Sequence, residues 1–107
     1  MEEKEKSKSI TAAIEAVLFV YGEPLETKRV AKILQRDPKL RMHPNDPNKS
    51  EQEIEEIIRK SLEELHQKYL EEDRGLKLVF KDDRVQLATK KEFTPLLENF
   101  IKEEFKE

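Results

Sequence analysis

The sequence predicts a mostly α-helical domain that carries one small β-hairpin, an α+β class. Apolar residues recur at three- and four-residue spacing in three segments before residue 75, which is the period of amphipathic helices. They alternate with period two between residues 76 and 89 and return to helical spacing after residue 90. The order helix-helix-helix-strand-strand-helix is typical of a winged helix-turn-helix fold. We expect it to fill residues 9–107 as a single domain behind a flexible charged leader, residues 1–8.

The composition indicates a folded core under a surface rich in ion pairs. Charged residues make up 42% of the chain and apolar residues 36%, yet the formal net charge is only −3 because acids and bases nearly balance. The chain has no cysteine, which excludes disulfides, thiolate metal sites and a cysteine nucleophile. No apolar run approaches the roughly 20 residues that cross a bilayer, so we expect a cytoplasmic protein.

The first two helices are expected at residues 9–21 and 26–35. Gly22 supplies the left-handed residue that ends the first helix, whose apolar stripe is Ile10, Ala13, Ile14, Val17, Leu18 and Tyr21. Phe19 lies off this stripe, so it either widens the buried face or touches a partner. The second helix stops at Asp37-Pro38, because a residue that precedes proline is pushed out of the α region. Residues 36–49 are expected to form a loop, pinned to the core by Leu40 and Met42.

The third helix is expected to begin at a capping box, Ser50 to Glu53, and to carry a strongly acidic solvent face. Between residues 51 and 72, eight glutamates stand against three lysines and arginines. Its expected ion pairs at four-residue spacing are Glu55–Arg59, Glu56–Lys60 and Glu64–Lys68. In a winged-helix fold this is the helix that would enter a DNA groove, and DNA-binding proteins neutralise phosphates with lysine and arginine. The pattern therefore predicts repulsion from DNA and favours protein binding.

The hairpin is expected from strands 76–81 and 84–89, joined by a tight turn at Asp82-Asp83. Alternation predicts one shared buried face, formed by Leu76, Leu78, Phe80, Val85 and Leu87. A final helix is expected from about residue 90 to 105, and two starts remain open for it. One is a second capping box from Thr89 to Glu92, and the other is Thr94 with Pro95 at the first helical position.

Several segments, in their order and spacing, resemble one known family. The first half contributes Ile14-Glu15-Ala16-Val17-Leu18-Phe19, Gly22-Glu23-Pro24-Leu25 and Val30-Ala31-Lys32-Ile33-Leu34. The second half contributes Leu62-Glu63-Glu64-Leu65, Tyr69, Glu72-Asp73-Arg74-Gly75-Leu76-Lys77-Leu78-Val79, Val85-Gln86-Leu87-Ala88-Thr89 and Glu92-Phe93-Thr94-Pro95-Leu96. Together they make the chain resemble segregation and condensation protein B (ScpB). The leader, residues 36–49 and the C-terminal residues lie outside the resemblance.

The resemblance implies an N-terminal winged-helix domain without catalytic activity or cofactor. It implies a homodimer that binds a kleisin subunit, segregation and condensation protein A, and through it the SMC ATPase of the chromosome condensation and segregation complex. It further implies a nucleoid-associated location, DNA contact that is only indirect or weak, and no membrane or small-molecule ligand. Three features depart from the family. The loop after the second helix is longer, Glu26 stands where a serine-type cap is common, and the usual second winged-helix domain is absent, so we expect a cut-down piece or a short relative.

The residues favour no catalytic and no metal site. His43 and His66 are the only histidines, and neither has metal-ligand spacing or a serine or cysteine nucleophile beside it. We expect both to be ordinary surface histidines. Paired glutamates on the third helix lie on its wet face, where nothing prepares them for acid–base chemistry. Two glycines in the whole chain leave no glycine-rich phosphate loop.

The last helix has more apolar residues than one narrow stripe needs, which favours a protein contact. We expect self-association or kleisin binding at this helix and at the end of the first, through Phe19, Tyr21, Leu25, Phe93, Leu96, Leu97, Phe100, Ile101 and Phe105. The alternative is that the last helix simply packs over the hairpin and the first helix.

The hairpin region is basic and offers a second kind of surface. Candidates for weak contact with nucleic acid are Lys77, Lys81, Arg84, Lys90 and Lys91. These side chains equally suit a solvated sheet edge, where lysines discourage pairing with other strands. The alternative function is therefore a winged-helix transcriptional regulator that contacts DNA through its basic wing.

Overall fold

The computed structural model describes residues 2–37, 40 and 51–104. Its elements, in chain order, are α1 (Glu2–Tyr21), β1 (Leu25–Glu26), α2 (Thr27–Leu34), α3 (Glu51–Glu71), β2 (Leu76–Lys81), β3 (Arg84–Thr89), the 3-10 turn η2 (Lys91–Phe93) and α4 (Thr94–Glu104). The predicted order of helices and hairpin strands is confirmed, and one short strand, β1, is added. No helix in the described part of the chain is both long and apolar enough to cross a membrane.

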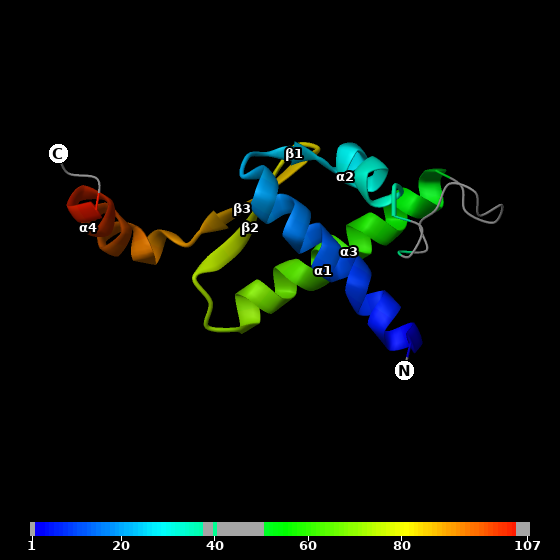
Figure 1. Cartoon of the computed structure of the whole chain (residues 1–107), viewed down its shortest axis with the longest axis horizontal. Coiled ribbons are helices and arrows are strands. Elements are labelled where there is room, and N and C mark those ends of the chain that lie inside the picture. The colour runs from blue at the N-terminus through cyan, green and yellow to red at the C-terminus, as the bar shows by residue number, and fades with distance from the viewer. Residues whose placement is uncertain (1, 38–39, 41–50, 105–107) are drawn as a thin grey trace.

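Helices α1, α2 and α3 enclose the core together with the inner face of the sheet (Figure 1). The long helices α1 and α3 cross one another, and α2 packs against both. The largest fully buried side chains are Ile14, Leu18, Val30, Ile58, Tyr69 and Val85. They come from every layer of the domain, so a single core holds the helices and the wing together. Leu40 is also buried, as expected, whereas Met42 and Ser50 lie outside the described residues.

Helix α1 begins at Glu2, earlier than the predicted start at Ser9. Residues 2–8, expected as a leader outside the domain, therefore continue the helix. No glycine or proline precedes Gly22, and the glutamates, lysines and serines of this segment are compatible with helix. Gly22 then ends α1 with a positive φ of 74°, and its N–H donates to the carbonyl of Leu18 at 3.1 Å.

Helix α2 begins next to the tip of the wing. Its N-cap residue, Glu26, makes no side-chain cap hydrogen bond, which agrees with the absence of a serine-type cap. Instead the backbone N–H of Thr27 donates to the carbonyl of Asp83 at 2.9 Å. A helix start leaves N–H groups without partners inside the helix, and here the hairpin turn satisfies one of them.

The sheet has three antiparallel strands in the order β1-β3-β2. Strands β2 and β3 have the predicted bounds, and the turn between them places Asp82 at a φ of 57°, a left-handed value that aspartate tolerates better than most residues. Strand β1 pairs Leu25 with Val85. Sequence periodicity did not predict it, because two residues are too few to show alternation.

The predicted inner face of the hairpin is correct for Leu78 and Val85, which are buried, and for Leu76 and Leu87, which are partly buried. Phe80 shares this face, since it pairs with Val85, but it is about half exposed and not buried as predicted. Phe80 is the next-to-last residue of β2 and lies against the side of α3, where its ring meets the edge of His66.

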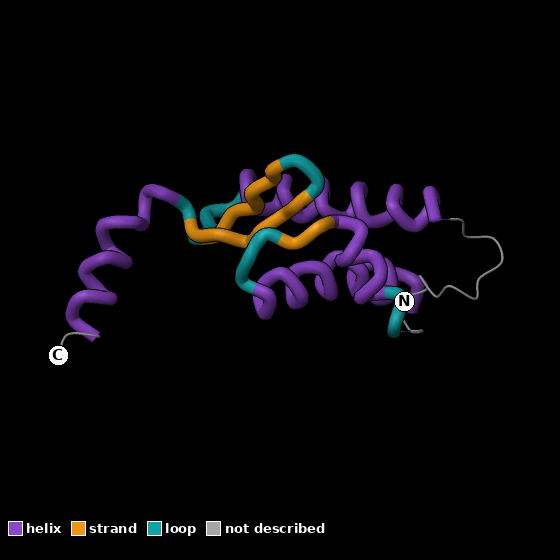
Figure 2. The backbone as a smooth tube through the Cα atoms, turned by 90° about the horizontal axis from the view of Figure 1, so that it is seen from above, coloured by secondary structure: helices purple, strands orange, loops and turns teal. Residues whose placement is uncertain are grey.

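Helix α4 stands apart from the rest of the domain (Figures 1 and 2). It begins at Thr94 with Pro95 in its first turn, so the second of the two predicted starts is correct. The expected range of about 90–105 divides into η2 and α4, and Phe105 lies outside the described residues. No residue of α4 is buried.

Candidate protein interface

Helix α4 presents an apolar face whose outer part is not covered by any described residue. Leu96, Phe100 and Ile101 are 65%, 55% and 53% exposed. Leu96 and Phe100 are four residues apart, as are Leu97 and Ile101, so all four side chains share one side of the helix. Glu98, on the other side, is polar and exposed. An isolated helix of 11 residues is marginal in water, because most helical stability comes from packing. Within the described chain, little packing is present to stabilise this helix.

A small hollow lies at the base of α4, where the arm leaves the sheet. It measures about 220 Å³ and is lined by Gly75, Leu76, Thr89, Phe93, Leu96 and Leu97. Phe93 and Leu97 are half-buried there, whereas the outer part of the helix is exposed. The hollow thus joins the inner end of the α4 face to the open end of the β2–β3 hairpin. An apolar side chain from another protein could fill it.

The end of α1 carries a second group of exposed apolar side chains. Phe19 is 72% exposed and Tyr21 is about half exposed, in agreement with their expected place at the surface. Neither lines the hollow at α4. Val20, 83% exposed, belongs to the α1 group and was missed. The run from residue 17 to 21 is apolar around the whole helix, and that signal could have found it.

Leu25 was predicted to lie in the interface, but the structure buries it. It is 3% exposed and sits in β1, where it pairs with Val85 at the centre of the core. Three exposed apolar residues outside α4 and α1 were not among the predicted interface residues, namely Leu70 on α3 and Val79 and Phe80 on β2.

The solvent face of α3 is acidic and internally paired. Arg59 donates to Glu56 through two of its nitrogens and lies 3.4 Å from the carboxylate of Glu63. The hydrogen bond from Arg59 holds the pKa of Glu56 below its ordinary value. The expected Glu55–Arg59 pair does not form, because Arg59 engages these two glutamates instead. The one arginine of this face is thus already occupied, which leaves its remaining glutamates to repel a phosphate backbone.

The basic residues of the wing do not form one continuous surface. Lys81 and Arg84 face each other across the hairpin at its exposed end, beside Asp82 and Asp83. Lys90 is half-buried, and its ammonium donates to the backbone carbonyl of Tyr69 at 3.1 Å. Lys77 is also half-buried, whereas Lys91 is exposed on η2. At least one of the five predicted cations therefore has a structural role.

His66 is not the ordinary surface histidine that we expected. Its ring lies edge-on to Phe80 with 5.3 Å between centroids, and its Nδ1 atom is buried without a hydrogen-bond partner in the described structure. His43 lies outside the described residues. Among those that are described, no group of three or more histidine, aspartate or glutamate side chains is placed to hold a metal ion.

Comparison with known proteins shows which family the chain matches. The model of the family "Segregation and condensation complex subunit ScpB" matches residues 12–107. Segregation and condensation protein B of Clostridium botulinum (strain Hall) is 31% identical over 102 residues, which cover 95% of this chain and 42% of that protein. The protein of the same name from Clostridioides difficile (strain 630) is 27% identical over 96 residues, covering 90% of this chain and 45% of the relative. The chain therefore spans less than half the length of these relatives.

A solved structure is similar over most of both chains. It is described as the crystal structure of a dimer of the ScpB N-terminal domain complexed with a ScpA peptide. The two folds superpose with a TM-score of 0.60 at 32% sequence identity, over 83% of this chain and 84% of the other. The winged-helix order, the shared residues and the family match over 96 residues agree with the resemblance seen in the sequence. This chain belongs to the ScpB family of segregation and condensation complex subunits.

Proposed function

We propose that this chain is a non-catalytic accessory subunit of an SMC-type chromosome condensation and segregation complex. In this role it forms a homodimer and binds the kleisin subunit ScpA, and through ScpA it reaches the SMC ATPase. It works in the cytoplasm, associated with the nucleoid. Family membership supports this assignment, as does the related crystal structure, described as a dimer with a ScpA peptide.

The observation that carries the proposal is the unburied apolar face of α4. No residue of this helix is buried, yet Leu96, Phe100 and Ile101 cluster on one side of it. Exposed apolar patches of this kind mark protein contacts, and most homo-oligomers are two-fold dimers in which the same patch serves both copies. We place self-association on α4 and its basal hollow, with Phe19 and Tyr21 as a second contact.

The mass of the protein in solution tests this assignment. The wild-type chain is expected at twice its 12.7 kDa in light scattering after gel filtration. Phe100→Glu places a charge in the apolar face and should give the mass of one chain. The matched control, Asn99→Glu, adds the same charge on the other side of the same helix and should remain dimeric. A Phe100→Glu protein that keeps the dimer mass would show that α4 is not the contact.

Binding to ScpA is tested separately by a pull-down with the ScpA protein encoded in the same genome. The wild-type chain is expected to retain ScpA in a complex of defined mass. If ScpA passes through at micromolar concentrations of both proteins, the assignment to this complex is wrong, whatever the oligomeric state.

The alternative, a transcriptional regulator that contacts DNA through the wing, makes the opposite prediction for DNA. Titration with a duplex at two salt concentrations should show tight binding that falls steeply with salt if Lys81 and Arg84 contact phosphates. We expect weak binding or none, since Asp82 and Asp83 lie between these two cations and the face of α3 is acidic. Loss of tight binding in a Lys81→Glu, Arg84→Glu protein would favour the regulator.

A further inference from the structure

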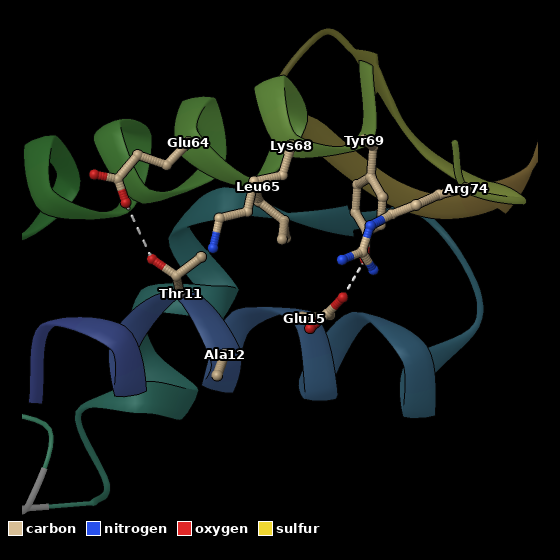
Figure 3. Close-up of a pocket in the computed structure, with 8 residues that line it drawn as sticks. All are labelled: Thr11, Ala12, Glu15, Glu64, Leu65, Lys68, Tyr69 and Arg74. Atoms are coloured by element: carbon tan, nitrogen blue, oxygen red, sulfur yellow. Dashed lines mark hydrogen bonds between the residues drawn. The ribbon is translucent and has the colours of Figure 1, made fainter. Parts of the chain in front are cut away.

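A polar groove runs between α1 and α3, on residues that the proposed dimer contact does not use (Figure 3). Its volume is about 320 Å³, and one wall comes from α1 while the other comes from α3 and from Arg74 in the following turn. Ala12 belongs to the α1 wall and adds no polar side-chain atom to the lining. Leu65, which is buried, supplies an apolar part of the lining.

The two acidic side chains of the groove are already engaged. Thr11 donates from its hydroxyl to Oε1 of Glu64 at 3.4 Å, and the hydroxyl of Tyr69 donates to Oε2 of Glu15. These two bonds join α1 to α3 at separate points, as Figure 3 shows. One oxygen of each carboxylate thus already accepts a hydrogen bond from within the domain.

The two cations of the groove have donors to spare. The ammonium of Lys68 points into the groove toward α1, and it makes no hydrogen bond or ion pair with any described residue. Arg74 donates from Nε to Glu72 at 2.5 Å, and its guanidinium lies 5.7 Å from the centre of the Tyr69 ring. This is within cation–π range, and the terminal nitrogens of the guanidinium donate no hydrogen bond to a described residue, so they remain for another acceptor. A guanidinium of this kind suits a carboxylate, and an ammonium lies in the same groove.

The charge of the groove differs from that of the rest of α3. Two glutamates and two cations line it, so its formal charge is zero, whereas the outer face of the helix is acidic. An acidic ligand is therefore not repelled locally. The unused hydrogen-bonding capacity is mostly donor capacity, and the lining also includes the apolar residues Leu65, which is largely buried, and Ala12. A free inorganic anion would use the donors but not this apolar surface.

We infer that this groove binds an acidic peptide segment whose carboxylate lies between Lys68 and Arg74, with an apolar neighbour against Ala12 and Leu65. The inference rests on the proposed function in one respect, since it assigns the segment to ScpA. Peptide recognition by charge-assisted hydrogen bonds at one end and apolar contact at the other selects sequence as well as charge. Self-association through α4 would leave the groove free for this ligand.

The test is a titration of the isotope-labelled chain, followed by amide resonances. The probe is a synthetic peptide of alternating glutamate and leucine, compared with the same peptide carrying glutamine and with inorganic phosphate. We expect the acidic peptide to shift the amides of Ala12, Lys68 and Arg74. Loss of the carboxylates should raise the dissociation constant about tenfold or more, because the free energy of a hydrogen bond to a charged group corresponds to at least about that change in affinity. Phosphate should bind more weakly still.

Charge reversal supplies the matched controls. Lys68→Glu should weaken the acidic peptide by about tenfold or more, whereas Lys60→Glu, on the same helix but outside the groove, should not. Shifts that cluster elsewhere, equal binding of phosphate, or an unchanged affinity in Lys68→Glu would each overturn the inference.

The same variants separate this inference from the proposed function. A Lys68→Glu protein should keep the dimer mass and lose ScpA in the pull-down. If it retains ScpA, the groove is not the ScpA site, although the proposed function stands. If even the wild-type chain fails to dimerise or to retain ScpA, the proposed function fails, and the peptide titration still decides whether the groove binds acidic segments.

Discussion

The hydroxyl of Tyr69, near the C-terminal end of α3, donates a hydrogen bond to Oε2 of Glu15 on α1. The ring of Tyr69 is 1% exposed and its backbone carbonyl accepts from Lys90, so this one residue joins α1, α3 and the end of the wing.

Replacing Tyr69 by phenylalanine should lower the free energy of unfolding by about 1–2 kcal/mol, because it removes a partly buried hydrogen bond to a charged group and keeps the ring. Urea denaturation measures the change. Tyr21→Phe is the matched control, since the hydroxyl of that half-exposed tyrosine is not tied to the core, and it should change stability by less than about 0.5 kcal/mol. Equal effects of the two substitutions would contradict the role of the Glu15 contact.

Stability should fall in alkaline solution for a reason specific to Tyr69. Burial, and then the hydrogen bond to Glu15, raises the pKa of this tyrosine above its ordinary value of about 10. Above that pH the unfolded chain releases the phenolic proton while the folded chain still holds it, so the unfolded state binds fewer protons and stability declines as pH rises. The decline approaches about 1.4 kcal/mol per pH unit. Urea denaturation at a series of pH values should show a shallower decline in Tyr69→Phe than in Tyr21→Phe.

Leu78 and Val79 are neighbours on β2 with opposite surroundings, which gives a direct test of where the core lies. Leu78→Ala removes buried methyl groups and should cost about 2–5 kcal/mol of unfolding free energy. Val79→Ala, on the outer side of the sheet, should cost less than about 1 kcal/mol in the same denaturation experiment. A reversed order would mean that the strand register is wrong by one residue.

The edge-on contact between His66 and Phe80 predicts an energetic coupling between α3 and β2. A double-mutant cycle with His66→Ala and Phe80→Ala should give an interaction energy of about 0.5–1.5 kcal/mol. Leu70→Ala, one turn further along α3, serves as the control partner for Phe80→Ala, and that pair should be close to additive. If the stability changes of His66→Ala and Phe80→Ala are also additive, the ring contact does not contribute to stability.

Periodic sequence patterns predicted the elements with strong repeats. The apolar stripes of α1 and α3 and the alternation of the hairpin correspond to residues that the structure buries, Ile14, Tyr69 and Val85 among them. The strand β1 was beyond such reasoning, since its two residues become a strand only through pairing with β3. For the same reason Leu25 was assigned to the surface, although the strand carries it into the core.

The candidate interface was predictable in composition but not in position. The excess of apolar residues after residue 90 predicted a contact surface, and α4 presents an exposed apolar face. Whether that helix folds back over the wing depends on the direction in which the chain leaves β3, which local sequence does not determine. The groove between α1 and α3 was missed altogether. It needs Ala12 and Lys68, more than 50 residues apart, to lie opposite one another.

The pairing of β1 with β3, together with the bond from Thr27 to Asp83, has a mechanical consequence. A hairpin paired only with itself could bend away from the helices, but here its tip is hydrogen-bonded to the segment between α1 and α2. A pulling force applied to the wing would therefore travel directly into the first two helices. The wing and the first two helices should therefore move together as one rigid unit.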